Sequence, residues 1–464
     1  MSYVVQIDLG KVIALNRLSL GTQVDDHGWR HFKDSPSRRA ILKEINPGFV
    51  RIFQWKMPPS RGPCTSWNSS THTGTFNWQE TDQVVNGIIA IGAEPIICVG
   101  NAYTGWSRAP PGMVMNPATS APYPDDWKEY MKAWVSHYKG KVKYWNSFNE
   151  GYHYYPWNAS PSDPLYQAFR DLHIAAYEGA HEVDPNCLVS FDAIMIRNAF
   201  EDFINGNYDV DFLDFHSYGG SSVEQSDREI LDIRSRMGYF GSGSFVGVEE
   251  ARQRFIDHKG YDPDIFHGEA NWSYVWTPST DPRNVYMQGA VLAAMQIGWG
   301  MELGLTNRVH FVFADDSSST PGHGFGMISD DTEYRRYPFL LYKMLGSQLG
   351  EGDPIYSISS NDPHVMPFAW RHGDTINILL VNKAGAPRSV DLSGVKGQVP
   401  YQKIVSDIPW NQAQILTGNL DLAQPIQMSE YEVLLLHTPI SPLDMLIRAA
   451  VGAASAIALI LTSL

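Results

Sequence analysis

The sequence predicts an α/β protein, a (β/α)8 barrel with a C-terminal antiparallel β-sandwich domain. Two observations lead to this fold class. Eight apolar runs alternate with helix-like segments through residues 10–345, and short alternating runs separated by turn residues fill residues 346–438. Eight units of strand and helix are typical of a (β/α)8 barrel. Alternating polar and apolar residues between closely spaced turns are typical of antiparallel strands.

The barrel strands are expected at eight runs: 18–23, 49–53, 94–99, 142–148, 188–193, 212–216, 265–268 and 309–314. Helices are expected at 125–138, 164–183 and 284–299, where apolar residues recur three and four positions apart. A doubly wound sheet is the alternative fold. It usually opens with a glycine-rich turn after its first strand, and the sequence has none there.

The second domain is expected to contain strands at 354–359, 366–371, 375–382 and 432–437. The run 4–9, and with it the segment 1–9, is a candidate addition to the same sheet. Three long segments rich in Pro, Ser and Gly, at 57–75, 104–124 and 313–326, are expected to be loops above the barrel. In a barrel such loops surround the active site.

Residues 439–464 form an apolar C-terminal tail, whose last sixteen residues (449–464) carry no charge. As a helix they would be about 24 Å long, against roughly 30 Å of hydrocarbon in a bilayer. Two uses therefore stay open: membrane association, and packing or self-association. The tail slightly favours an extracellular or cell-surface location, although the N-terminus lacks the features of a signal peptide.

Composition excludes several classes of function. A net charge of −15 and the absence of any Lys/Arg-rich run argue against a nucleic-acid partner, because phosphate binding needs a basic patch. The three cysteines, Cys64, Cys98 and Cys187, are too widely spaced for a disulfide framework or a zinc pattern.

Two glutamates stand at the ends of predicted barrel strands. Glu150 follows the fourth run and Glu269 follows the seventh. Because the C-terminal ends of parallel strands meet on one rim, both carboxylates are expected to face one site. Such a pair can cleave a glycosidic bond. Aromatic residues 152–157 follow Glu150, and their desolvation of its carboxyl is expected to raise its pKa toward that of a general acid.

Other residues are expected to support Glu269. Arg51 lies inside an apolar run, where a charge is costly unless it is paired, and Glu269 is its expected partner. Tyr218 is a candidate phenol donor to Glu269, and His216 a candidate donor to a substrate hydroxyl. Glu249 and Glu250 are rival nucleophiles, but a carboxylate pair before a helix is also explained by the helix dipole.

These residues give the sequence a family resemblance. Asn149 and Glu150 after the fourth strand, a second glutamate after the seventh, and the series His216-Ser217-Tyr218 resemble the clan A retaining glycoside hydrolases. The chain most resembles glycoside hydrolase family 39, the β-xylosidase and α-iduronidase group, over residues 10–438.

The resemblance implies a role for each matching position. Glu150 would be the acid/base and Glu269 the nucleophile of a double displacement. Asn149 would bind the sugar 2-hydroxyl, Tyr218 would hydrogen-bond the nucleophile, and Arg51 would lie beneath it. The substrate would be an oligosaccharide or glycoside, and no cofactor is implied.

The last predicted strand departs from the family pattern. Many clan members carry a Trp there as a sugar platform, whereas this strand reads His-Phe-Val-Phe-Ala-Asp at 310–315. Stacking on the sugar is therefore expected from Trp272 or Trp276. Xylosides, glucosides, galactosides, uronic-acid sugars and galactans all stay open as substrates, because a fold does not fix its substrate.

Two alternatives belong to other classes. One is a non-catalytic carbohydrate-binding or cell-surface protein, for which two buried carboxylates are not required. The other is a metal-dependent hydrolase that uses His216, His267, His310 and His323. The first strand has no His-x-His, and the sequence has no His-Glu-x-x-His.

Overall fold

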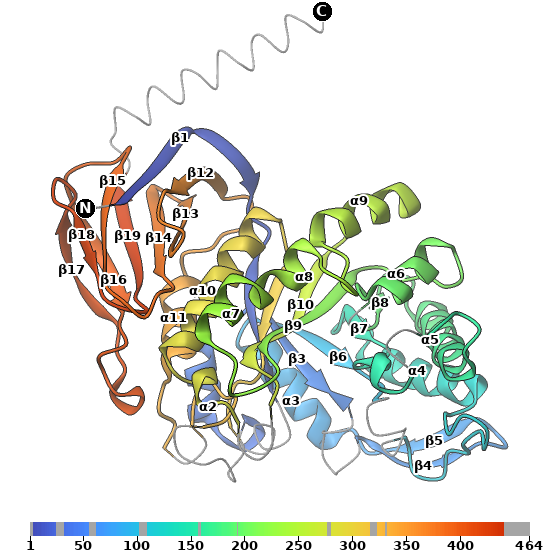
Figure 1. Cartoon of the computed structure of the whole chain (residues 1–464). Helices are drawn as coiled ribbons and strands as arrows, with labels where there is room; N and C mark the ends of the chain where they lie inside the picture. The colour runs from blue at the N-terminus through green and yellow to red at the C-terminus, as the bar shows by residue number, and fades with distance from the viewer. Residues whose placement is uncertain are drawn as a thin grey trace, which may run out of the picture.

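The computed structural model describes residues 3–24, 32–54, 62–101, 109–155, 159–192, 194–275, 280–315, 323–329 and 332–439. Figure 1 shows a parallel barrel surrounded by helices, with a second β-sheet packed beside it. The predicted fold class is confirmed in these two parts.

The barrel is an eight-stranded parallel sheet. All eight predicted runs form its strands, in the spatial order β8-β7-β6-β3-β2-β11-β10-β9. Their bounds are β2 (Ser19–Val24), β3 (Phe49–Phe53), β6 (Glu94–Cys98), β7 (Tyr144–Asn146), β8 (Leu188–Ser190), β9 (Leu213–Gly220), β10 (Ile265–Ser273) and β11 (Asn307–His310).

Hydrogen bonds link β8, one end strand of this sheet, to the two residues just before β9, the other end strand, and so curl the sheet toward closure. The Asp211 N–H donates to the Val189 carbonyl at 2.8 Å, and the Ser190 hydroxyl donates to the Phe212 carbonyl at 2.8 Å. The C-terminal ends of all eight strands therefore surround one space, which is where a barrel builds its site.

Helices cover the outside of the barrel. The α-helices are α2 (Pro36–Glu44), α3 (Gln79–Ala90), α4 (Pro124–Tyr138), α5 (Pro164–Val183), α6 (Arg197–Ile204), α7 (Asp227–Asp232), α8 (Met237–Phe240), α9 (Val248–Lys259), α10 (Met287–Glu302) and α11 (Tyr337–Gly346). The 3-10 turns are η2 (Gly151–His153), η3 (Arg234–Arg236), η4 (Pro282–Asn284) and η5 (Trp410–Gln412). Local signals fix their starts: Asp163 caps α5 by accepting from the Leu165 and Tyr166 N–H groups.

The second sheet has nine strands, in the order β17-β16-β19-β14-β13-β12-β1-β15-β18. They are β1 (Tyr3–Leu15), β12 (Pro354–Ser360), β13 (Val365–His372), β14 (Thr375–Asn382), β15 (Arg388–Ser393), β16 (Gln398–Ile404), β17 (Leu416–Asp421), β18 (Ile426–Met428) and β19 (Val433–Pro439). The strand pairs are antiparallel except β1 and β15, which are parallel. The sheet is therefore mixed where the sequence predicts antiparallel strands.

Helix α10 joins the barrel to the second sheet. It is buried along nearly its whole length and contacts β10 on one side and β1 and β14 on the other. A side chain at Gly298 would lie 2.3 Å from the ring of Phe368, so glycine lets α10 approach β13 closely. The two parts thus share a packed boundary.

The segment predicted as a loop at 57–75 contains a hairpin, β4 (Cys64–Asn68) with β5 (Thr73–Phe76). Trp67 is buried there, and its indole N–H donates to Asp126 of α4 at 2.9 Å. In β4 the exposed Thr65 and Ser66 stand together between the buried Cys64 and Trp67, so the strand lacks the strict polar–apolar alternation that would indicate it in the sequence. Residues 102–108 and 316–322, from the other two predicted loops, lie outside the described part of the chain.

Of the predicted apolar tail at 439–464, Pro439 ends β19 and residues 440–464 lie outside the described part of the chain. Within the described ranges, none of the helices combines the length and apolarity needed to cross a bilayer.

Candidate active site

Glu150 lies on the barrel rim just beyond β7. The Asn149 N–H donates to the Gly100 carbonyl at 2.8 Å, which holds this segment beside the end of β6. The backbone of Glu150 is left-handed, with φ 45° and ψ 55°. This conformation costs a non-glycine residue about 1–3 kcal/mol and is concentrated at functional sites. It turns the Glu150 side chain over the barrel opening.

Three side chains hold the Glu150 carboxylate. The Tyr152 hydroxyl donates to Oε1 at 2.8 Å, and His216 Nδ1 lies 2.8 Å from the same oxygen. His153 Nε2 lies 3.2 Å from Oε2. The carboxylate is mostly buried, with 15% of the side chain exposed, so a small solvent opening remains for a substrate.

The protonation of Glu150 differs from the expectation of a raised pKa. Burial raises its pKa, but hydrogen bonds from His153 and His216 outweigh burial and hold the pKa below its usual range. Burial lowers the pKa of His216, but Glu269, Glu150 and Asp192 raise it to about 9. In the unliganded protein at neutral pH the proton therefore lies on His216, and Glu150 is ionised.

Glu269 lies on β10 and is 4% exposed. The Tyr218 hydroxyl donates to its Oε2 at 2.6 Å, and Arg51 donates to its Oε1. Tyr218 lies on β9 and Arg51 on β3, so the site joins three strands.

Arg51 is fully buried and connects several groups. Its guanidinium donates to Gln23 Oε1 at 2.5 Å and to Asn149 Oδ1 at 2.8 Å, in addition to Glu269 and Asp192. It also lies 4.4 Å from the centre of the Phe53 ring. A buried guanidinium is tolerated when its partners neutralise it and fill its donors.

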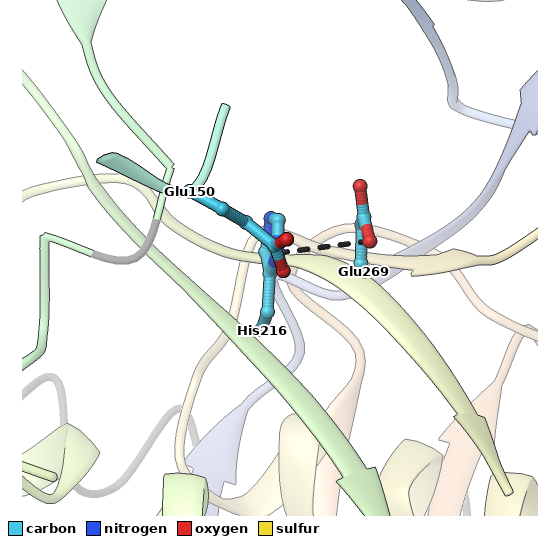
Figure 2. A group of neighbouring side chains, drawn as sticks. All are labelled: Glu150, His216 and Glu269. Atoms are coloured by element: carbon cyan, nitrogen blue, oxygen red, sulfur yellow. Dashed lines mark hydrogen bonds and ion pairs between the residues drawn. The ribbon is translucent and has the colours of Figure 1, made fainter. Parts of the chain in front are cut away.

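Glu150 and Glu269 approach each other closely. One oxygen of each carboxylate and a ring nitrogen of His216 all lie within 4.8 Å of one another. Figure 2 shows the three side chains turning their polar ends toward one another from separate parts of the rim. The barrel thus assembles two carboxylates that are 119 residues apart (269 − 150) in the sequence.

Two further carboxylates, Asp192 and Asp214, lie beneath this group, and the sequence interpretation missed them. Asp192 follows β8 and Asp214 lies on β9, each with 1% exposure. The Asn146 amide donates to both, at 3.3 Å to Asp214. The sequence did contain a signal for them. Each aspartate is a charged residue within a predicted apolar run, and the same feature singled out Arg51.

Burial shifts the titration of both aspartates. Burial and the adjacent Asp192 carboxylate together raise the pKa of Asp214 to about 8. Burial raises the pKa of Asp192 to about 6, although Arg51 opposes this shift. At pH 7 Asp214 therefore carries a proton and Asp192 is ionised.

The raised pKa of Asp214 predicts that Asp214→Asn increases the free energy of unfolding, by an amount that depends on pH. Between pH ~4 and ~8 the unfolded chain ionises this carboxyl while the folded chain keeps it protonated, so the wild type loses stability as pH rises. Asparagine mimics the protonated carboxyl and does not titrate. We expect the stability of the variant relative to wild type to rise by about 3–4 kcal/mol between pH 5 and pH 8. Urea denaturation at both pH values measures this difference, and an equal effect at both would contradict it.

Removing the Arg51 charge is expected to destabilise the fold. Arg51→Met leaves Glu269 and Asp192 buried without their cation, which costs about 3–5 kcal/mol. Arg308→Met is a matched control, because the buried Arg308 donates to the neutral Gln296 and Tyr342. Its loss should cost less, about 1–3 kcal/mol. Urea denaturation of both variants measures the difference, and equal losses would contradict the charge network.

The remaining predicted site residues divide into two groups. Asn149 lies at the site beside Arg51. His216 also lies there, but its Nδ1 is bonded to Glu150 rather than free for a substrate hydroxyl. Trp272 is not at the site, because it is fully buried with Arg283 5.2 Å from its ring centre. Trp276 lies outside the described residues. Tyr274 is 52% exposed and its ring lies 6.0 Å from that of Tyr218.

The rival nucleophiles lie elsewhere. Glu249 and Glu250 are exposed in the first turn of α9, and Glu250 pairs with Arg197 and Arg254. They match the helix-dipole explanation.

Histidines of the metal-hydrolase alternative are scattered. His267 is buried against Tyr239, whose hydroxyl lies 2.8 Å from Nδ1, and His323 binds the Thr280 carbonyl. Among the described residues, two groups are compact enough to hold a metal ion: Glu150–His216–Glu269 and Asp192–Asp214–His216. Arg51 already neutralises one carboxylate of each group, and its charge disfavours a second cation there.

Comparison with known proteins rests on structure. No family model and no curated protein match the sequence. A glucosidase from Croceicoccus marinus is 15% identical, with a TM-score of 0.62 over 95% of this chain and 100% of that one. The glycoside hydrolase family 39 enzyme from Xanthomonas axonopodis pv. citri is 15% identical, with a TM-score of 0.60 over 95% and 98%. A monomeric β-xylosidase from Caulobacter crescentus CB15 is 16% identical, with a TM-score of 0.59 over 95% and 100%.

The overlap covers the barrel and the second sheet together, since it leaves only about one-twentieth of the chain unmatched. Solved structures of clan A glycoside hydrolases, with family 39 among them, therefore share this architecture. The predicted resemblance is confirmed at the level of structure: this chain has the fold of the clan A glycoside hydrolases.

Proposed function

We propose that this protein is a retaining glycoside hydrolase in which Glu150 is the acid/base and Glu269 is the nucleophile. The observation that carries the proposal is the close approach of the two carboxylates on one barrel rim, with one oxygen of each within 4.8 Å of the other. Retaining enzymes place their carboxyls about 5–5.5 Å apart, whereas inverting enzymes need roughly 6.5–9.5 Å for a water molecule between them. The short separation supports retention.

The different surroundings of the two glutamates support different roles. Glu269 accepts hydrogen bonds from Arg51 and Tyr218, which hold its carboxylate in place for nucleophilic attack. Glu150 is the more exposed of the two, at 15% against 6% of the side chain. A leaving group could reach it from solvent.

The reaction proceeds in two displacements. Glu269 attacks the anomeric carbon as the glycosidic C–O bond breaks, and Glu150 gives a proton to the departing oxygen. Glu150 then removes a proton from water, which attacks the glycosyl–enzyme ester and releases the sugar with its original configuration. Arg51 holds Asn149 through its Oδ1, so the Asn149 NH2 group is the donor available for the sugar 2-hydroxyl.

The substrate is a carbohydrate. The structures that share the fold include a glucosidase, a family 39 enzyme and a β-xylosidase. This range supports a glycoside substrate without selecting the sugar.

A panel of aryl glycosides tests the proposal. Nitrophenyl xylosides, glucosides, galactosides, arabinosides and glucuronides should include at least one substrate for the full chain. Proton NMR of the first product should show the anomer of the starting glycoside. Initial release of the opposite anomer would contradict retention. Saturable binding of oligosaccharides without turnover on any glycoside would favour a non-catalytic carbohydrate-binding protein instead.

A further inference from the structure

His216 lies between two pairs of carboxylates. Its Nδ1 is 2.8 Å from Glu150 Oε1 and 3.7 Å from Glu269 Oε2. Its Nε2 is 3.7 Å from Asp192 Oδ2 and 3.8 Å from Asp214 Oδ1. Only 3% of the His216 side chain is exposed, so solvent contributes little to its protonation. The catalytic pair lies on one edge of the imidazole and the aspartate pair on the other.

The aspartate pair has unused hydrogen-bonding capacity on the side that faces His216. Within the described residues, Asp214 Oδ1 and His216 Nε2 are buried atoms without a hydrogen-bond partner. Asn146 donates to both aspartates and fixes them side by side. Gly268 makes room for them, because a side chain there would lie 2.4 Å from Asp214 Oδ1.

Anions outnumber cations around His216. The titratable or charged groups that face it are Arg51 on β3, Cys98 on β6, Glu150, Tyr152 and His153 after β7, Asp192 after β8, Asp214 and Tyr218 on β9, and Glu269 and His267 on β10. Burial keeps His267 neutral at pH 7 by lowering its pKa well below the usual range. Four carboxyl groups therefore surround one fixed cation, Arg51. This excess of acidic groups stabilises a second positive charge, on His216.

We propose that Asp192 and Asp214 are positioning residues that between them carry one proton and hold His216 as an imidazolium, which supplies Glu150 with the proton for the leaving group. The idea rests on the proposed glycosidase function. Two neighbouring buried carboxyls do not both ionise readily. The ionised one, Asp192, faces the Nε2–H, which directs the Nδ1–H to Glu150.

The proton transfer is balanced in both displacements. As the substrate occupies the site, the His216 Nδ1–H bond breaks and a Glu150 Oε1–H bond forms. That proton leaves with the departing alcohol. In the second displacement Glu150 takes a proton from the attacking water and passes it back to Nδ1. The imidazolium is restored at the end of each turnover.

Histidine titration tests the proposal without requiring activity. The full chain is labelled with [13Cε1]histidine, and the His216 signal is identified by its loss in His216→Gln. We expect His216 in the wild type to stay protonated through pH 7, with a titration near pH 9. Asp192→Asn should move that titration down by at least one pH unit, about tenfold in proton affinity. Asp214→Asn should keep His216 protonated at pH 7, because asparagine mimics the protonated carboxyl that Asp214 carries there.

The control is Asp202→Asn, which removes another buried aspartate, on α6, that accepts from Tyr166. It should leave the His216 titration unchanged. A neutral His216 at pH 7, or an unchanged titration in Asp192→Asn, would overturn the proposal. If Asp192→Asn does not fold, the wild-type titration alone still decides whether His216 is an imidazolium.

Activity gives a second readout, on the aryl glycoside that the wild type cleaves fastest. Asp192→Asn should lower kcat/KM by about tenfold or more on the alkaline side of the pH profile, whereas Asp202→Asn should not. The loss should shrink for a dinitrophenyl glycoside, whose leaving group needs no proton. Equal losses for both leaving groups would count against a proton-supply role. If the wild type cleaves no glycoside, the proposed function fails while the histidine titration still judges this inference.

Discussion

Glu269→Gln should lower kcat by at least about 10⁴-fold, the scale of loss seen when a covalent nucleophile is removed. The amide cannot form the glycosyl ester, although it fills the same space and can still accept from Tyr218. The measurement is kcat on the best aryl glycoside. A 2-deoxy-2-fluoro glycoside with a good leaving group should label the wild type within residues 265–273, and mass spectrometry should find no such adduct in the variant.

Glu249→Gln is the matched control for this experiment. Glu249 was the rival nucleophile in the sequence and is an exposed residue in the first turn of α9. Its variant should keep wild-type kcat and the covalent label. Retention of activity in Glu269→Gln, with loss in Glu249→Gln, would reverse the assignment.

Glu150→Ala should produce a loss that depends on the leaving group. A general acid contributes about 10²–10⁴-fold, so kcat/KM should fall by that factor for a methyl or alkyl glycoside. A dinitrophenyl glycoside leaves without protonation, and its first displacement should be nearly normal. Steady-state turnover would then be limited by the second displacement, which lacks its base. Azide should restore turnover and yield a glycosyl azide of retained configuration.

The matched control is Glu250→Ala, whose glutamate is exposed on α9 and pairs with Arg197 and Arg254. It should not change the leaving-group dependence. Circular dichroism and urea denaturation should show that Glu150→Ala is folded, because the residue lies on the barrel rim and is outside the hydrophobic core. An equal loss for every leaving group, together with no azide product, would remove Glu150 from the acid/base role.

The sequence predicts the barrel well because each buried parallel strand is a short apolar run. It also predicts the pairing of Arg51 with Glu269, since a charge inside such a run demands a partner. The same reasoning applied to Asp192 and Asp214 would have found the buried aspartates. What the sequence lacks is the set of neighbours: Asn146 lies on β7, Asp192 just after β8 and Asp214 on β9, and only the fold of the sheet brings them together.

Strand irregularity explains a second difference between expectation and structure. By strict alternation His267 and Glu269 would face the same side of β10. The pairing of β10 with its neighbour β9 shifts register between these two residues, as it does at a β-bulge. His267 instead stacks on Phe215, with ring centres 4.5 Å apart, while Glu269 faces Tyr218. Gly268, between the two residues, is the marker that the local sequence offers, because a glycine inside a strand often signals a bulge.

Trp272 shows the limit of reading a motif as a site. Its position three residues after Glu269 suggested a sugar platform, but the alternation that directs Glu269 inward directs Trp272 outward toward Arg283. Composition alone does not favour the half-exposed Tyr274 over Trp272 as the stacking residue, because both residues are aromatic and close in sequence.

The pairing of β1 has a consequence for how the chain is made. β1 (Tyr3–Leu15) joins β12 (Pro354–Ser360) and β15 (Arg388–Ser393), so its partners leave the ribosome roughly 340 residues after it does. At about 5–20 residues per second, this strand waits roughly 20 to 70 s for them. During that time its valines and isoleucines are unpaired on a growing chain. Cellular yield should therefore depend on chaperones that bind the unpaired β1, and slow translation should lower it.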